Sequence, residues 1–269
     1  MVEHAAADEI IGGAYLYKST VPGKISGCFH GCLAAEVVIA ERQLGGFGDD
    51  LGVMYYRNGW EWHEDSERLF GIPVPLGMLL DNIFETVSDL SRSAGADFAV
   101  DTLRAMAPGA DLQTGMEMWF ASLLTDYMAP LRGVVGTPVG EYVAEMVAAI
   151  GDRHAGRDVD WESLWEYLGE RARLFQHEKE PSSDGWGEWA ERHRAAAFAE
   201  SLCDYFDGDN SAVKHALDAV GIPKHERIKF AETLIVALGA SPIVTAPRPA
   251  PLAYISDTTP VAELVGAGV

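Results

Sequence analysis

The chain is poor in the residues that several classes of protein require. Its 269 residues include three cysteines without regular disulfide spacing, which favours a reducing compartment. Lys and Arg number 20 against 41 Asp and Glu, and a formal net charge of -21 disfavours nucleic-acid binding through phosphate contacts. No run approaches the ~18 apolar residues of a membrane span, and the first residues lack the basic start and apolar stretch of a signal peptide. We therefore expect a cytoplasmic protein with no membrane partner, or a virion protein if a phage encodes it.

Short catalytic and cofactor motifs are also missing from the sequence. There is no phosphate-binding G-x-x-x-x-G-K-[ST] loop, no G-x-G-x-x-G after a strand and no G-x-S-x-G elbow. The Glu-x-x-His pairs of a di-iron bundle do not occur either. We accordingly assign no catalytic residue, no cofactor and no metal ligand from the sequence, and we favour a protein that is not an enzyme.

Helical periodicity dominates what the sequence does contain. Hydrophobic residues make up 48% of the chain, and they recur at helical spacing with no convincing strand alternation. We predict an all-α fold, an irregular multi-helix domain over residues 1–240 with a possible sub-boundary near 181–185. Residues 241–269 are rich in Pro and Ala, and we predict an extended C-terminal arm there.

Several helix starts can be placed from proline and capping residues. Gly71-Ile72-Pro73 and Thr137-Pro138 each predict a helix, since proline is tolerated in the first turn. Asp160 is placed to cap a further helix. Residues 52–70 are aromatic-rich, and we expect them to be irregular. The helix after Pro73 should bury one apolar stripe, formed by Leu76, Leu79, Leu80, Ile83, Phe84 and Val87.

The segment Gly27–Cys32 is the most local chemical signal. Cys28, His30 and Cys32 together suggest a soft metal such as Zn²⁺, which thiolate and imidazole both suit. The favoured interpretation is two small buried thiols, because no second ligand pair lies nearby in the sequence. Glu141 and Glu145 lie four residues apart on one helix face, which we interpret as a solvated acidic face rather than a metal site.

Aromatic residues provide the candidate contacts with a partner. Tyr55, Tyr56, Trp60 and Trp62 fall in the segment expected to be irregular, where exposed aromatic side chains would concentrate binding energy. The alternative is a loop packed on the core. In the arm, Leu252 and Tyr254 are apolar enough to add buried area to a neighbour.

Three motifs in a fixed order carry a family resemblance. They are Gly27-Cys28-x-x-Gly31-Cys32, then Phe70-Gly71-Ile72-Pro73 running on to Leu80-Asp81-x-Ile83-Phe84-Glu85, then Gly109-Ala110-Asp111-Leu112. The order resembles a group of helical proteins encoded by phages and bacteria, whose members read GCxxGC, LGIPxxLxxLxDxIFE and GADL. The resemblance covers about residues 25–165. The group has no established function, so no functional residue is carried over. Members often have His three residues after the second Cys, where this chain has Ala35.

Three functions follow from these observations as expectations. The first is a non-enzymatic interaction or structural protein, a virion or assembly component encoded by a phage, which binds a protein partner or its own copies through the arm. The second is an acidic inhibitor or immunity-type protein that binds a basic partner, and its binding should weaken steeply with salt. The acidity equally suits a high-salt cytoplasm or simple solubility. The third is a helical metalloenzyme that uses Cys28, His30 and Cys32 or the Glu141/Glu145 face.

Overall fold

The part of the chain that the structure describes is built from helices. This computed structural model describes residues 10, 17–18, 25–33, 59–127, 138–164, 166–167, 201–206, 208–209, 212 and 227–244. The elements are α4 (Gly59–Phe70), α5 (Val74–Leu90), α6 (Arg92–Ala105), α7 (Leu112–Ser122), η1 (Leu123–Tyr127), α8 (Pro138–His154) and α12 (Arg227–Gly239). The predicted all-α class is confirmed for these residues.

One small strand pair lies outside the helices. Strand β1 (Tyr17–Lys18) pairs antiparallel with β2 (Ile25–Ser26), and a short helical segment follows at residues 29–33. Two residues per strand are too few for an alternating apolar pattern to be visible in the sequence. For the same reason the pair leaves the helical character of the fold unchanged.

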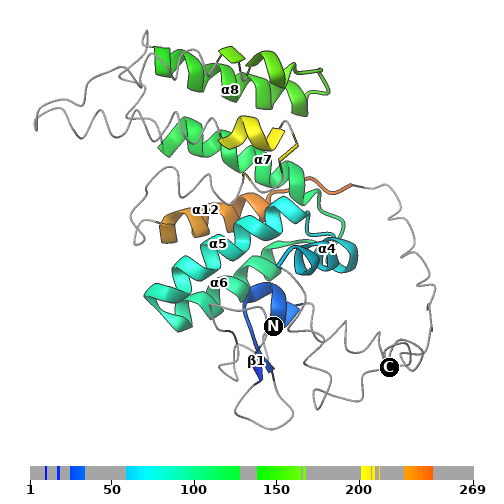
Figure 1. Ribbon diagram of the computed structural model, residues 1–269, viewed down its shortest axis with the longest axis vertical. Coiled ribbons are helices and arrows are strands. Elements are labelled where there is room, and N and C mark those ends of the chain that lie inside the picture. Colours follow the sequence, from blue (N-terminus) through cyan, green and yellow to red (C-terminus); the bar gives the residue numbers. More distant parts are fainter. Residues whose placement is uncertain are drawn as a thin grey trace, which may run out of the picture.

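Helix α5 lies at the centre of the core formed by the described residues. It begins at Val74, directly after Pro73, and so confirms the predicted helix start. Pro75 lies in its first turn, where proline is tolerated. All six residues of the predicted stripe are at most 3% exposed. Helices α4, α6, α7 and α12 all pack against α5. Figure 1 shows the resulting order, with α8 at one end, then α7, then α12 and α5, then α6 and α4.

The segment 59–70 corrects the sequence analysis, because it is helix α4 and not irregular. Its buried residues are Trp62, His63 and Ser66, which share one helix face, whereas Glu64, Glu67 and Arg68 are exposed. The high aromatic content concealed this ordinary amphipathic pattern. Trp62 is 1% exposed, so its side chain packs in the core and offers no surface to a partner.

The ends of two further helices follow the predicted local rules. Helix α8 begins at Pro138. Asp160 accepts hydrogen bonds from the Ser163 backbone N–H at 3.0 Å and from its hydroxyl at 2.8 Å, which lowers the pKa of this carboxyl. Both findings confirm that proline and capping positions are legible from sequence. The boundary near 181–185 and the arm beyond residue 244 lie outside the described residues.

His30 links the N-terminal segment to α4 and α5. Its Nδ1 lies 2.9 Å from Ser66 Oγ, and its Nε2 lies 2.9 Å from the carbonyl oxygen of Gly77. Burial, together with the neighbouring His63, holds the pKa of His30 well below its usual range, so the ring is neutral. A side chain at Gly77 would place its Cβ 2.8 Å from His63 Nδ1 and 3.2 Å from His30 Cε1. Glycine therefore allows both rings to approach α5.

Replacing Gly77 by alanine tests this close approach. Gly77→Ala should lower the free energy of unfolding by about 1–3 kcal/mol, because the added methyl group overpacks the two imidazole rings. Gly151→Ala in α8 is the matched control, since nothing lies within 4 Å of the new Cβ. There alanine should raise the free energy of unfolding by about 0.5–1 kcal/mol through its better helix propensity. Urea unfolding measures both, and similar responses of the two variants would contradict the packing described.

Candidate interaction surface

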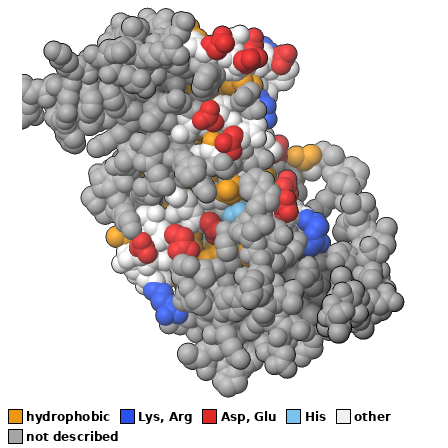
Figure 2. All heavy atoms as spheres, viewed as in Figure 1, with side chains coloured by type: hydrophobic (Ala, Val, Ile, Leu, Met, Phe, Trp, Pro, Cys, Tyr) orange, Lys and Arg blue, Asp and Glu red, His pale blue; other side chains and the backbone are white. Residues whose placement is uncertain are grey.

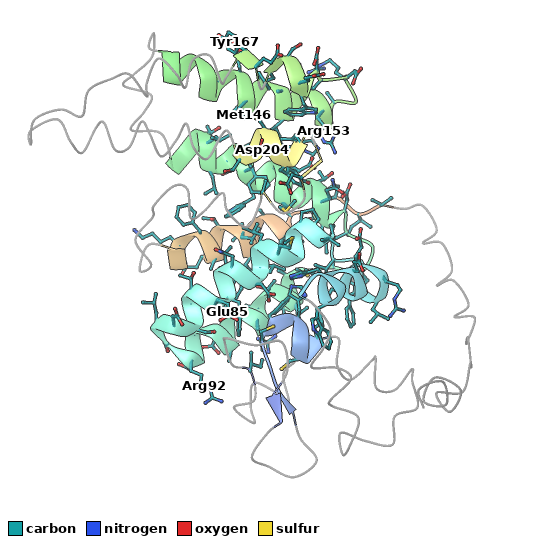
Figure 3. All side chains as sticks on the ribbon, viewed as in Figure 1. Glu85, Arg92, Met146, Arg153, Tyr167 and Asp204 are labelled. Atoms are coloured by element: carbon teal, nitrogen blue, oxygen red, sulfur yellow. The ribbon has the colours of Figure 1, made fainter. Side chains whose placement is uncertain are left out.

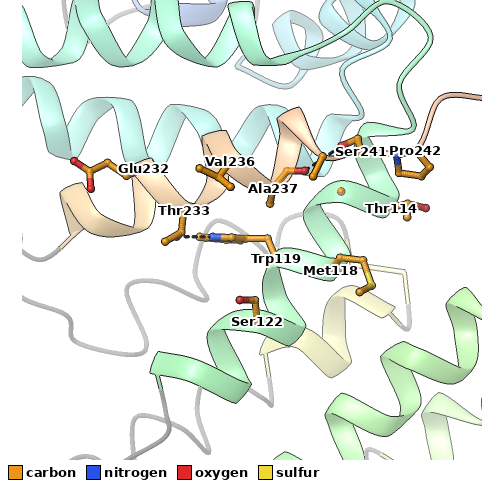
Figure 4. A pocket seen from close by; sticks show the side chains of 12 residues that line it. Thr114, Met118, Trp119, Ser122, Glu232, Thr233, Val236, Ala237, Ser241 and Pro242 are labelled. Carbon is orange, nitrogen blue, oxygen red and sulfur yellow. Dashed lines mark hydrogen bonds between the residues drawn. The ribbon is translucent and has the colours of Figure 1, made fainter.

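A hollow between α7 and α12 is the strongest candidate for a functional surface. It has a volume of about 530 Å³ and opens between the two helices near the start of the C-terminal arm. We call it the α7–α12 hollow (Figure 4). Its lining comprises Thr114, Gly115, Met118, Trp119, Ser122, Glu232, Thr233, Val236, Ala237, Ala240, Ser241 and Pro242.

Two contacts set the distance between the helices around the hollow. Trp119 is 1% exposed and donates from Nε1 to Thr233 Oγ1 at 2.9 Å, which joins α7 to α12 across the hollow (Figure 4). At the other end, a Cβ on Gly115 would lie 2.0 Å from Ser241 Oγ, so the backbone of α7 closely approaches Ser241. The lining is therefore fixed by rigid helices, which favours a preformed site.

Exposed apolar side chains concentrate at this surface. Among the described residues, the large hydrophobic side chains that are exposed are Leu90, Met118, Val236, Ile243 and Val244. Met118 and Val236 line the hollow, and Ile243 and Val244 follow its last lining residue. Val236 is 72% exposed and Ile243 57%. Single exposed hydrophobic residues are ordinary, but a group of them on one surface marks a contact site.

The arm begins at the rim of the hollow with a short extended pairing. The Asp111 backbone N–H donates to the carbonyl of Pro242 at 2.8 Å, and the Val244 N–H donates to the carbonyl of Gly109 at 2.9 Å. Ala110 and Ile243 face each other as an antiparallel bridge between these two bonds. In such a ladder the N–H and C=O of Ile243 point away from residues 109–111. The described part of the arm is thus anchored, and its direction at Val244 is set.

The two predicted contact residues that the structure describes, Trp60 and Trp62, do not line the hollow. Trp62 is buried in α4, and Trp60 belongs to the same helix. Tyr55, Tyr56, Leu252 and Tyr254 lie outside the described residues.

Met118 and Val236 lie in α7 and α12 and were not singled out in the sequence analysis. The run Leu234-Ile235-Val236 was the available signal, since three consecutive residues cannot all face one side of a helix.

A second, polar cluster surrounds Glu117, which is only 2% exposed. Its carboxylate accepts hydrogen bonds from Tyr205 Oη at 2.9 Å, Gln113 Nε2 at 3.1 Å and Arg153 Nε at 3.2 Å. His154 Nε2 lies 3.1 Å from Oε2 as an ion-pair contact. Burial, reinforced by the charge of Glu117, raises the pKa of Tyr205 far above its usual value. The hydroxyl therefore stays a donor.

The Glu117 cluster joins three parts of the fold. Glu117 lies on α7, Arg153 and His154 on α8, and Tyr205 on the helical segment 201–206. Figure 3 labels Arg153 and, from that last segment, Asp204. A polar hollow of about 640 Å³ borders it, lined by residues that include Asp111, Arg157 and Asp158. Every oxygen of the buried carboxylate has a donor, so the arrangement serves as a polar crosslink between α7 and α8.

The cysteines behave as small core residues. Cys28, Cys32 and Cys203 are free thiols, each at most 2% exposed. Burial, with a further contribution from the Asp81 charge, raises the pKa of Cys28 well above its usual value. A buried thiol of this kind is a poor nucleophile. This confirms the interpretation of Cys28 and Cys32 as two small buried thiols. Glu145 is exposed on α8, as expected for a solvated acidic face.

Acidic side chains are prominent among the described residues on the face drawn in Figure 2. On the face drawn in Figure 2, Asp and Glu side chains gather over the end that contains α8 and recur along the middle of the molecule. Lys and Arg lie at a few separate points on that face. None of the described helices combines the length and the apolar character that crossing a bilayer would demand.

Comparison with known proteins returned no match to a family model, to a curated protein or to a solved structure. The likeness to the phage and bacterial group therefore stays a prediction from its three motifs.

Removing the Glu117 carboxylate tests its role as a crosslink. Glu117→Ala should lower the free energy of unfolding by about 1–3 kcal/mol, because it leaves the buried Tyr205 hydroxyl without its acceptor and removes the pair with the partly exposed Arg153. Glu117→Gln keeps the shape and should cost less. Arg104→Ala is the control, since its pair with Asp101 is exposed on both sides and should matter by less than about 1 kcal/mol. Chemical denaturation reports all three values, and equal losses at Glu117 and Arg104 would argue against the crosslink.

Proposed function

We propose that this chain is a non-enzymatic interaction protein that assembles with its own copies, as a virion or assembly component would. The arm of one copy, residues 245–269, docks into the α7–α12 hollow of a second copy. The single observation that carries the proposal is the pair of exposed apolar side chains in the lining of the hollow, Met118 and Val236, with the exposed Ile243 and Val244 following its last lining residue in the chain. Burying such a group in a neighbour removes apolar area from water, which favours association.

Charge favours the arm as the occupant. Within residues 245–269 the charged side chains are Arg248, Asp257 and Glu263, so this segment is nearly neutral in a chain of net charge -21. Any other acidic part of a second copy would be repelled by the surface around the hollow, which includes Glu232. The arm also supplies apolar side chains of the size that the hollow admits, among them Leu252, Tyr254 and Leu264.

The spacing of prolines favours docking onto a neighbour over docking back onto the same copy. Pro247, Pro249 and Pro251 alternate immediately after the anchored residues, and such a sequence favours extended polyproline II. At about 3.1 Å per residue, that conformation would place Leu252 roughly 25 Å from Val244. The arm's apolar residues would then lie well beyond the rim of their own hollow.

The alternative function, an acidic protein that captures a basic partner, rests on the acidic surface in Figure 2. The two functions differ in their response to salt. An apolar arm-to-hollow contact should persist at 0.5 M NaCl, whereas a complex held by opposite charges should dissociate as salt screens them.

Four forms of the protein test the proposal by native mass spectrometry and sedimentation: the full chain, a chain ending at Val244, Val236→Asp and Leu90→Asp. We expect the full chain to form a discrete oligomer. Both the truncation and Val236→Asp should weaken association by roughly tenfold or more. The truncation removes the arm that docks, and Val236→Asp would require a carboxylate to be buried in the contact. Leu90→Asp is the matched control, because Leu90 is an exposed apolar residue that does not line the hollow and should leave the oligomer intact.

Two results would contradict the proposal. One is a full chain that is monomeric at all concentrations. The other is an oligomer that survives both the truncation and Val236→Asp. A monomer that binds basic partners only at low salt would favour the acidic-inhibitor function instead.

A further inference from the structure

Three side chains that can bind a metal ion lie close together inside the core. They are far apart in the sequence, so no local motif predicts the group. His30 comes from the short helical segment 29–33, His63 from α4 and Asp81 from α5. One ligand atom from each lies within 4.8 Å of the others. His30 is 0% and His63 3% exposed, so the two imidazoles are shielded from water.

The arrangement of His30 has the features of a supported metal ligand. A carbonyl oxygen can only accept, so the contact between His30 Nε2 and the Gly77 carbonyl makes Nε2 the protonated nitrogen of the neutral ring. The lone pair is then on Nδ1, which accepts a hydrogen bond from the Ser66 hydroxyl at 2.9 Å, so a metal ion bound through Nδ1 would displace that hydroxyl. Metal-bound histidines commonly donate their second N–H to a backbone carbonyl, which fixes the ring and the tautomer. His30 already makes that contact.

The other two residues are held at a compatible spacing. His63 Nε2 lies 3.6 Å from Asp81 Oδ2, and the rings of His30 and His63 meet edge to face with centroids 4.7 Å apart. Gly77 provides the room, since a Cβ at this position would lie 2.8 Å from His63 Nδ1. In a tetrahedral site with bonds of about 2.1 Å, two ligand atoms lie roughly 3.4 Å apart. Binding therefore requires ligand atoms that now lie within 4.8 Å of one another to approach by up to about 1.4 Å.

From this geometry we propose that His30, His63 and Asp81 bind one divalent transition-metal ion, with Zn²⁺ as the best match. Two imidazoles and one carboxylate are donors that Zn²⁺ accepts, whereas Mg²⁺ and Ca²⁺ prefer oxygen ligands throughout. The two neutral rings and the Asp81 carboxylate would leave the loaded site with one positive charge. The ion would join the N-terminal segment to α4 and α5, so its first effect would be on stability.

This ligand set differs from the one suggested by the sequence. The Cys28–Cys32 segment does contribute His30, but the group of mutually close ligand atoms contains neither thiol. Glu141 and Glu145 are not part of it either. The two sets make opposite predictions about which substitutions release the metal.

Metal titration of the full-length chain tests the site. The protein is stripped with a chelator and then titrated with Zn²⁺ by calorimetry, and its thermal unfolding is followed with and without the ion. We expect one Zn²⁺ per chain and a higher unfolding temperature in its presence. No Zn²⁺ binding by the stripped wild-type chain would overturn the proposal and leave the three residues as hydrogen-bonded core groups.

Variants then assign the ligands. Asp81→Asn is close in shape to the native residue and should weaken Zn²⁺ binding by tenfold or more. His154→Asn removes a histidine outside the site and should leave the affinity unchanged, as should the double variant Cys28→Ala/Cys32→Ala. Far-ultraviolet circular dichroism of the metal-free proteins checks that each variant folds. Loss of Zn²⁺ in the cysteine variant, with retention in Asp81→Asn, would overturn the assignment.

Cobalt provides a readout that needs no variant. Co²⁺ bound by His30, His63 and Asp81 should lack the intense thiolate-to-cobalt charge-transfer band. The appearance of that band on titration of the wild-type chain would place the ion on the cysteines and contradict the proposed ligand set.

Discussion

Burial of the apolar stripe of α5 is the constraint on which the rest of the described structure depends. Each fully buried Leu, Ile or Phe contributes about 1.5–3 kcal/mol relative to exposure, and α5 presents six large apolar residues on one stripe. Helices α4, α6, α7 and α12 all cover this helix. Because they converge on one axis, α7 and α12 are brought into contact with each other as well, and the α7–α12 hollow lies at that contact.

Two polar clusters inside this core are held by hydrogen bonds. His30 forms hydrogen bonds with Ser66 and with the carbonyl of Gly77. Glu117 accepts hydrogen bonds from side chains on α7, on α8 and on the segment 201–206. An unsatisfied group in either place would cost more than the hydrogen bonds contribute, so such clusters fix the relative positions of the elements that supply them. The same requirement that makes them structural crosslinks makes the His30 cluster a suitable place for a metal ion.

The α7–α12 hollow has a different origin. Gly115 and Ser241 bring the helices close at one end, while Trp119 spans the gap to Thr233 further along, so the groove between them is left partly filled. Met118 and Val236 therefore remain on the surface although both belong to apolar stretches. The anchored start of the arm follows at residues 241–244, where Ile243 and Val244 are also exposed.

Local rules in the sequence determined the helical class, the helix starts at Pro73 and Pro138, the cap at Asp160 and the buried stripe of α5. These features depend on residues one to four positions apart, so periodicity and capping reveal them. Only the tertiary structure decided that Trp62 is buried in α4, that Val236 is exposed, and that His63 and Asp81 meet His30. Those outcomes depend on which helices pack together and at what distance. Contacts between distant segments produce no periodic pattern in a single sequence. The reason for a glycine at position 77 is likewise visible only in the structure, where His30 and His63 pack against it.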